Sequence, residues 1–305
     1  MARRDRRYWF RLIRFFIVSL TGLVLGLPFL IGVLSTVGLL YVPCSSSGPD
    51  PAAYGYAWED VTIQARAGGS FRAYFIPGQN GATIIVAPTL ASGRGVRWPE
   101  TLLLLKHGYG VLTFESRRCA GMGPLSLGFK EVDEVADALD YLHQRPEVDP
   151  ERIGVYGFSQ AGATTIMAAA RLPGLKAVVA EGGYGDFSSN ALGTAHNEGL
   201  VARYFKWGHR HSFEPMYRLI TGLDLAVLSP VSVIDQISPR PILLIYGSQE
   251  ISLSGAYEQL AAAGENAELW VVEGAGHGNY LTVAGAEYET RLVGFFDAAL
   301  LHKIR

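Results

Sequence analysis

One short turn, Gly157-Phe158-Ser159-Gln160-Ala161-Gly162, constrains the fold of this chain more than any other segment. It follows a short apolar run and precedes an Ala-rich helical pattern over residues 163–171. A G-x-S-x-G turn between a strand and a helix strains the serine backbone and lifts its hydroxyl above the sheet edge. Gly157 supplies the small residue on one side, and Ala161 stands where the second glycine is expected. This context predicts that Ser159 is a nucleophile, although a surface turn can show the same letters.

Length and charge exclude some classes of protein. The 305 residues suffice for one large α/β domain or two small ones. With 26 basic and 28 acidic residues, the chain gives no sign of the basic face that nucleic acid requires. Its two cysteines, Cys44 and Cys119, are too few for a disulfide framework and match no metal-ligand spacing. The cysteine count leaves the redox compartment open.

The N-terminal segment is predicted to anchor the chain in a membrane. Six arginines precede an uncharged stretch over residues 15–41, and these are Arg3, Arg4, Arg6, Arg7, Arg11 and Arg14. A helix of that length would measure about 40 Å, more than the roughly 30 Å hydrocarbon core of a bilayer. The following Tyr41-Val42-Pro43-Cys44 lacks the small-residue site of a cleaved signal peptide. An uncleaved signal anchor is therefore favoured over a signal peptide or a buried core helix.

The arginines also predict an orientation. After Tyr41 no Lys or Arg occurs until Arg66, so the positive flank is N-terminal. The positive-inside rule then places the N-terminus in the cytoplasm and residues 45–305 on the outer side of a single-pass membrane protein. The predicted parts are the Arg-rich segment and anchor (1–44), a linker (45–57), and an α/β domain (58–305).

Hydrophobic patterning after the linker alternates between strands and helices. Strands are predicted at residues 61–65, 71–76, 83–87, 110–114, 152–156, 175–180, 242–246 and 268–272. Helices are predicted at residues 96–107, 132–143, 163–171, 254–263 and 287–301. Apolar strands separated by helices indicate a mostly parallel sheet that is covered on both faces. An aromatic-rich insert over residues 186–239 interrupts this rhythm.

The residues that a nucleophilic serine needs follow it in the chain. The base must accept its proton, and an acid must orient that base. Glu250 lies in the turn after the strand at 242–246, and His277 lies in a Gly-rich turn after the strand at 268–272. Because the carboxyl ends of parallel strands share one edge, these residues can converge with Ser159. We predict a triad of Ser159, His277 and Glu250, in the chain order Ser, acid, His.

Other residues compete for these roles. Glu181, at the end of the preceding strand, and Asp224, within the insert, are rival acids. The remaining histidines lie at helix ends, in the insert or near the C-terminus, and they are His107, His143, His196, His209, His211 and His302. Of these, the His209/His211 pair keeps a metal-binding role open, but the predicted chemistry requires neither a metal nor an organic cofactor.

Acyl transfer also needs donors for the developing oxyanion. The backbone N–H of Gln160, directly after the nucleophile and at the start of a helix, is the first. The second is expected from the loop Pro88-Thr89-Leu90-Ala91, where either Thr89 or Leu90 can supply it. We take Leu90 as the candidate.

With these residues in view, residues 58–302 resemble the α/β-hydrolase superfamily, in particular membrane-anchored members of the Bem46 and abhydrolase-domain-13 kind. Residues 108–117 resemble the family strand that ends in an Asp-x-Arg-Gly turn, and residues 142–153 resemble the helix and linker that lead into the elbow. Ser229-Pro230 and residues 239–244 resemble the approach to the acid strand. The resemblance implies the α/β-hydrolase fold, with an eight-stranded, mostly parallel sheet.

The chain departs from the family pattern at four places. Pro88-Thr89 replaces the usual His-Gly, and Glu250 stands where the family generally has Asp. Arg118 replaces the Gly after Arg117, and Ala161 replaces the second elbow glycine. None of these changes removes a triad group.

The resemblance implies a membrane-anchored serine hydrolase that cleaves an ester or thioester through an acyl-enzyme intermediate. A serine peptidase or amidase with the same triad stays open, as does a non-catalytic, membrane-tethered binding module. The expected partners are a small or lipid-like acyl substrate and the membrane, without nucleic acid; the oligomeric state is not indicated. The insert is expected to form a lid over an acyl pocket or a cap on the sheet, through Tyr204, Phe205, Trp207, Phe213 and Tyr217.

Overall fold

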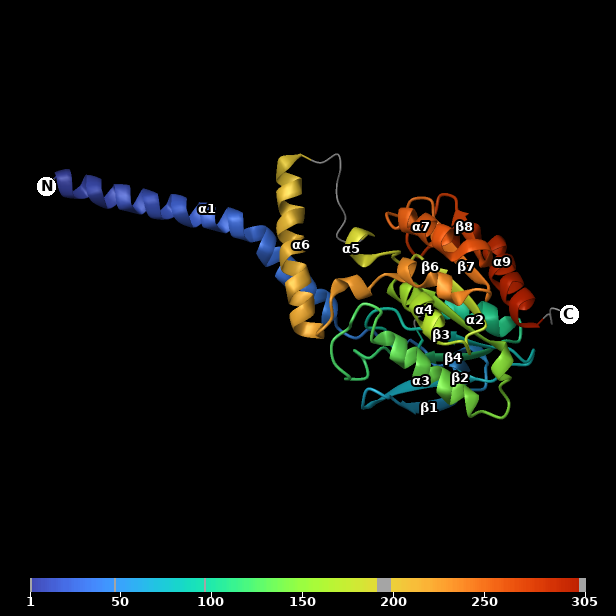
Figure 1. Ribbon diagram of the computed structural model, residues 1–305. Coiled ribbons are helices and arrows are strands. Elements are labelled where there is room, and N and C mark those ends of the chain that lie inside the picture. The colour runs from blue at the N-terminus through green and yellow to red at the C-terminus, as the bar shows by residue number, and fades with distance from the viewer. Residues whose placement is uncertain (1, 47, 96, 191–198, 302–305) are drawn as a thin grey trace. The chain divides into compact units, whose positions relative to one another are not determined.

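The computed structural model describes residues 2–46, 48–95, 97–190 and 199–301 of the chain (Figure 1). Its contacts divide into two compact units. One unit comprises Met1–Leu39 and Leu192–Asp224, and the other comprises Leu40–Ala191 and Leu225–Arg305. The second unit contains the sheet and every residue of the predicted triad.

The sheet has eight strands in the order β1-β2-β4-β3-β5-β6-β7-β8. The strands are β1 (Glu59–Gln64), β2 (Ser70–Ile76), β3 (Thr83–Val86), β4 (Gly110–Phe114), β5 (Ile153–Phe158), β6 (Ala177–Glu181), β7 (Ile242–Gly247) and β8 (Ala267–Val272). β2 pairs antiparallel with β1 and with β4, and the six strands from β4 to β8 pair in parallel. The eight predicted strands and the mostly parallel sheet are therefore confirmed.

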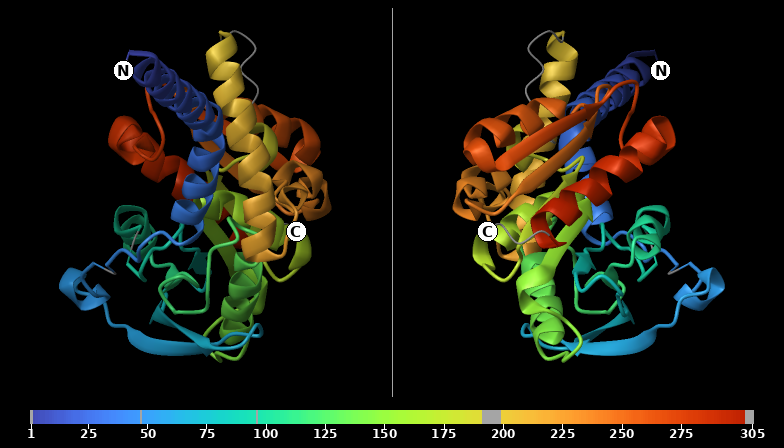
Figure 2. Two further views of the ribbon diagram at one scale, coloured as in Figure 1. Left: turned by 90° about the vertical axis from the view of Figure 1, so that its left-hand side faces the viewer. Right: turned by 90° about the vertical axis from the view of Figure 1, so that its right-hand side faces the viewer.

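Helices cover both faces of this sheet, as the alternation predicts. The longer ones in this unit are α2 (Trp98–Lys106), α3 (Glu131–His143), α4 (Gln160–Arg171), α7 (Leu253–Ala263) and α9 (Ala286–Phe296), and short α5 (Phe187–Asn190) and α8 (Tyr280–Ala284) join them. Side chains of α3, α4 and α7 belong to one buried core, and those of α2, α8 and α9 belong to the other. Figure 2 shows α7 and α9 on opposite sides of the strands.

The strands supply both cores because successive side chains of a strand point to opposite faces. In β7, Leu244 and Tyr246 join the core under α3, α4 and α7, whereas Leu243 and Ile245 join the other core. A strand buried on both faces reads as the continuous apolar run seen at residues 242–246.

Residues 2–40 form one long helix, α1 (Ala2–Leu40). Its portion Tyr8–Leu40 has a mean hydropathy of 2.4 and is long and apolar enough to cross a membrane. The structure therefore contains the predicted candidate anchor.

Both the insert and the linker contain short elements of secondary structure, and the insert contains more of them. The insert contains α5, α6 (Leu200–Thr221) and three 3-10 turns, Leu225–Val227, Pro230–Ser232 and Ile234–Ile237. Ile234 and Ile237 belong to a core of the sheet, while α6 belongs to the other unit. The linker contains the 3-10 turn Pro51–Tyr54, capped by the Asp50 side chain. The predicted domain boundaries at 44, 57, 186 and 239 stay predictions.

A disulfide that the sequence did not indicate joins Cys44 to Cys119, whose Cα atoms lie 5.2 Å apart. The pairing escaped prediction because 75 residues separate the two cysteines. Two backbone hydrogen bonds also hold this segment. Leu125 N–H donates to the Leu40 carbonyl (2.9 Å), and Ser45 N–H donates to the Ala91 carbonyl (2.8 Å). The chain that leaves α1 is thus fixed to the sheet unit beside the loop that follows β3.

Removing this disulfide is expected to destabilise the sheet unit. A closed loop of this length restricts the unfolded chain by about 4 kcal/mol in the chain-entropy account. The double variant Cys44→Ala/Cys119→Ala should therefore unfold at lower denaturant concentration, measured by circular dichroism in detergent. Reducing agent should shift the wild-type midpoint in the same direction and leave the variant unchanged. Equal midpoints for oxidised and reduced wild type would contradict the expectation.

Candidate active site

Ser159 occupies a strained turn between β5 and α4. Its backbone has φ 58° and ψ −126°, and a positive φ is uncommon for a residue with a side chain. A Cβ at Gly157 would lie 2.3 Å from the Ala161 carbonyl oxygen, so only glycine fits there. A second close approach falls at Gly162, whose Cβ would lie 2.8 Å from the Glu181 carbonyl oxygen. These contacts explain why small residues surround the serine.

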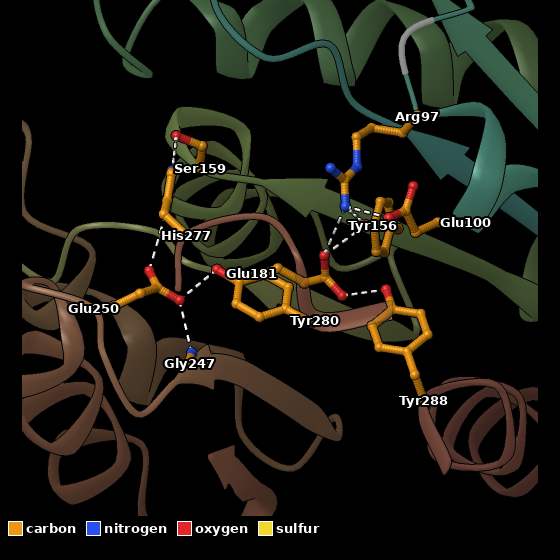
Figure 3. Close-up of polar contacts among 10 residues, drawn as sticks. All are labelled: Arg97, Glu100, Tyr156, Ser159, Glu181, Gly247, Glu250, His277, Tyr280 and Tyr288. Atoms are coloured by element: carbon orange, nitrogen blue, oxygen red, sulfur yellow. Dashed lines mark hydrogen bonds and ion pairs between the residues drawn. The ribbon is translucent and has the colours of Figure 1, made fainter. Parts of the chain in front are cut away.

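The structure brings the three predicted triad residues together (Figure 3). His277 Nε2 lies 2.9 Å from Ser159 Oγ, and His277 Nδ1 lies 2.9 Å from Glu250 Oε2. The residues follow β5, β7 and β8, whose carboxyl ends share one edge of the sheet. Two hydrogen-bond distances of this kind are those a nucleophile, a base and an orienting acid require.

The His277 turn is shaped by contacts with the elbow. The His277 ring packs on the Phe158 ring at a centroid distance of 4.7 Å. A Cβ at Gly278 would lie 2.7 Å from the same phenylalanine ring, and Gly278 has φ 86°. Glycine at this position therefore lets the histidine loop lie against the nucleophile strand.

Glu250 is a buried carboxylate with several donors. Its side chain is 1% exposed, and it accepts hydrogen bonds from Gly247 N–H (2.7 Å), Tyr280 Oη (2.5 Å) and Ser252 Oγ (2.9 Å). Burial raises the pKa of Glu250, but the hydrogen bonds from His277, Tyr280 and Gly247 outweigh it and hold the pKa below its ordinary value. The carboxylate is thus charged at neutral pH and can accept a hydrogen bond from an N–H at His277 Nδ1.

The rival acid Glu181 has partners other than the histidine. Glu181 is fully buried and accepts hydrogen bonds from the hydroxyls of Tyr156 (2.7 Å) and Tyr288. Asp224 lies at the end of the other unit. Because Glu250 already occupies Nδ1 of His277, the geometry favours it as the orienting acid.

The two predicted oxyanion donors, the N–H groups of Gln160 and Leu90, differ in whether they already have a hydrogen-bond acceptor. Gln160 is the first residue of α4, and first-turn N–H groups have no acceptor within their helix. Leu90, at φ 44°, donates its N–H to Oε1 of the Gln160 side chain at 3.0 Å. Leu90 can serve an oxyanion only when the substrate oxygen replaces that amide oxygen. The choice between Leu90 and Thr89 stays a prediction.

A buried ionisable cluster that the sequence did not predict lies beside β5, the strand that leads to Ser159 (Figure 3). Arg97 forms ion pairs with Glu100 and with Glu181 (3.4 Å), and Tyr156 and Tyr288 complete the cluster. The Arg97 guanidinium also lies over the Phe158 ring, 4.2 Å from its centroid. Burial raises the pKa of Glu181 to about 7, against the opposing effect of Arg97. Only the strand-end position of Glu181 had singled out a member of this cluster.

The raised pKa of Glu181 predicts a pH-dependent stability. Between about pH 4.5 and 7, the unfolded chain loses this proton while the folded chain keeps it, so the free energy of unfolding falls as pH rises. A shift of this size corresponds to about 3 kcal/mol. Glu181→Gln should flatten that part of the pH profile, measured by urea unfolding at pH 5 and pH 8. Parallel profiles for variant and wild type would count against the assignment.

Within the described part of the chain, no group of three or more His, Cys, Asp or Glu residues is placed to hold a metal ion. His209 Nε2 lies 2.8 Å from Ser35 Oγ, and His211 Nδ1 lies 2.8 Å from the Trp207 carbonyl oxygen. These two histidines therefore have separate protein partners. His196 and His302 lie outside the described residues.

The sheet order, the serine turn after β5 and the Ser–His–Glu arrangement at the carboxyl edge define a member of the α/β-hydrolase superfamily, with a serine hydrolase-type fold. A model of the prolyl oligopeptidase family matches residues 115–303, more than half of the chain. The chain therefore belongs to that family. The finer resemblance to Bem46-like proteins stays a prediction.

Individual relatives agree with this assignment. The uncharacterized protein YfhR of Escherichia coli K12 is 25% identical over 216 residues, which cover 67% of this chain and 65% of YfhR, just under two thirds of its length. Thiohydrolase aneE of Aspergillus aculeatus is 40% identical over 68 residues, 21% of each chain. The structure of the Pyrococcus furiosus esterase Pf2001 matches with a TM-score of 0.66 at 23% identity, covering 85% of this chain and 99% of the esterase. The esterase structure shows that this chain shares its fold.

Proposed function

We propose that this protein is a membrane-anchored serine hydrolase that cleaves an ester or thioester through an acyl-enzyme intermediate. The observation that carries the proposal is the continuous hydrogen-bonded path from Ser159 through His277 to Glu250, with 2.9 Å at each step. The strained backbone of Ser159 supports it, because such strain persists where the surrounding structure enforces it and is common at active sites.

In the proposed first step, Ser159 Oγ attacks the acyl carbonyl carbon while His277 Nε2 accepts the hydroxyl proton. Glu250 stabilises the imidazolium that forms. The oxyanion accepts a hydrogen bond from the backbone N–H of Gln160. After Gln160 Oε1 is displaced, it accepts a second one from the backbone N–H of Leu90. His277 then gives its proton to the leaving oxygen or sulfur, and the bond from that atom to the carbonyl carbon breaks.

The second step releases the acyl group. A water molecule attacks the acyl carbon, and its proton passes to His277 Nε2. Collapse of this intermediate breaks the bond to Ser159 Oγ, which takes the proton back from His277. The acid product then leaves, and the site returns to its starting state.

The proposed topology places the N-terminus in the cytoplasm and the hydrolase unit outside. The N-terminal arginines support this orientation, and so does the Cys44–Cys119 bond, because disulfides persist in oxidising compartments. External protease added to intact cells should digest the hydrolase unit and spare an N-terminal tag. The reverse pattern would overturn the orientation.

Peptide cleavage on the same triad is the second candidate, favoured by membership in the prolyl oligopeptidase family. The name of the aneE relative and that of the P. furiosus esterase instead favour esters and thioesters. A panel of p-nitrophenyl esters of increasing chain length, matched thioesters and aminoacyl p-nitroanilides separates these leaving groups. Higher kcat/KM for the acyl esters or thioesters is expected, and higher values for the anilides would assign a peptidase.

A binding module without catalysis is the remaining alternative. A fluorophosphonate probe reacts with an activated serine, so the wild-type chain should be labelled at Ser159. Absence of labelling in protein that circular dichroism shows to be folded would favour the binding module.

A further inference from the structure

The solvent exposure of α1 differs before and after Pro28. Over residues 8–27 every side chain is exposed except Leu12, which is half-buried. Beyond that point, buried positions recur every fourth residue, at Pro28, Gly32, Thr36 and Leu40. Because residues four apart share one face of a helix, the second part of α1 is covered along one side and the first part is bare.

Helix α6, of the same unit, covers α1 at Pro28 and Gly32 (Figure 1). A Cβ at Gly32 would lie 2.0 Å from Ser212 Oγ, and a Cβ at Gly208 would lie 2.5 Å from Pro28 Cβ. The two backbones therefore meet where glycine permits it. Ser35 Oγ lies 2.8 Å from His209 Nε2, which adds a polar contact to the crossing.

The contacts also give the direction of α6 along α1. Tyr204 Oη donates to the Leu25 carbonyl (2.5 Å), and the Trp207 ring lies 5.4 Å from the Phe29 ring. Later residues of α6 contact later residues of α1, as Ser212 does with Gly32. The amino end of α6 thus lies on the side toward the bare part of α1.

The bare part has the length of a membrane span. Residues 8–27 form a helix of about 30 Å, which equals the hydrocarbon thickness of a typical bilayer. Tyr8 and Trp9 begin it with the aromatic pair typical of a membrane interface, and Arg11 and Arg14 are near enough to that end to reach headgroups. Arg203, Lys206 and Arg210 lie in the α6 segment that contacts α1 from Leu25 onward, and charged side chains at this level favour a position outside the hydrocarbon for the later residues of α1.

The first turns of α6 have the composition of an interfacial helix. Leu200 is 81% exposed, Val201 is 74% exposed, and Trp207 is 50% exposed. Arg203 and Lys206 lie between these apolar residues. Apolar and aromatic side chains interleaved with basic ones are typical of helices that lie in the headgroup region, where anionic lipids attract the charges.

We propose that the amino-terminal half of α6, through Leu200, Val201 and Trp207, inserts into the interfacial region of the outer leaflet beside α1. This inference rests on the proposed membrane anchoring by α1 and adds a second lipid contact to it. The membrane span then ends near Leu27. Residues 28–40 form an extramembrane stalk, which α6 contacts closely at Gly32. The partner is the bilayer itself, with its anionic headgroups and upper acyl chains.

The experiment uses the full-length chain in liposomes of phosphatidylcholine and phosphatidylglycerol. Because Cys44 and Cys119 are joined, an introduced cysteine is the free thiol that an environment-sensitive dye will label. Leu200→Cys is the test position, and Leu219→Cys is its matched control, a leucine near the other end of α6 with 78% exposure. Val18→Cys, in the bare part of α1, reports on the anchor itself.

Dye at positions 18 and 200 should shift to shorter wavelength and be quenched by brominated lipid, while dye at position 219 should do neither. Quenching at 18 with equal responses at 200 and 219 would overturn the interfacial role of α6 and leave the anchor standing. No quenching at 18 would overturn the anchoring, and the α6 proposal with it.

Discussion

Replacing Ser159 with alanine is expected to lower kcat on a p-nitrophenyl ester by on the order of 10⁴- to 10⁶-fold, because no other hydroxyl lies against His277 Nε2 in the described site. The residual rate would come from binding and from the oxyanion donors. Alanine adopts the same backbone conformation as serine with no added bulk, so the elbow should keep its geometry. Fluorophosphonate labelling should disappear together with turnover.

A matched substitution distinguishes loss of the nucleophile from general damage. Ser232 lies in a 3-10 turn of the same unit, where its hydroxyl donates to the Ser229 carbonyl (2.7 Å). Ser232→Ala should retain labelling and turnover. If Ser159→Ala kept both as well, the nucleophile would have to be another residue.

The sheet and the position of the serine could be predicted from the sequence because both depend on local patterns. Apolar runs such as residues 242–246 are continuous where a strand is buried on both faces. Gly157 and Gly162 lack side chains because the turn brings other backbone within contact distance of them. Ser159, Glu250 and His277 then converge because the carboxyl ends of parallel strands share one edge.

The contacts that escaped prediction join residues far apart in the chain. The Cys44–Cys119 bond depends on where the segment after α1 meets the loop after β4. The bond from Leu90 N–H to the Gln160 side chain depends on the path of the loop after β3. Arg97 directly precedes α2, in the connection after β3, and Glu181 ends β6, so their contact depends on a sheet order that places β3 and β6 on either side of β5. Hydrophobic periodicity and short motifs do not predict contacts of this kind.

Replacing Glu250 with glutamine is expected to lower kcat by about 10⁴-fold, with a smaller change in KM. The amide keeps the size of the side chain, but its NH₂ group donates toward His277 Nδ1 where the carboxylate accepted. The imidazole then carries its proton on Nε2 and cannot take one from Ser159. Loss of the carboxylate also removes the charge that stabilises the imidazolium. Steady-state kinetics on the same ester measure both parameters.

Two companion variants make this prediction specific to Glu250. Glu250→Asp keeps the charge at a shorter reach and should retain far more activity than Glu250→Gln. Glu181→Gln removes the rival acid, whose carboxylate lies among Tyr156, Tyr288 and Arg97 and not at His277, so its main effect should be on stability. A large loss of kcat in folded Glu181→Gln, with Glu250→Gln nearly active, would transfer the orienting role to Glu181.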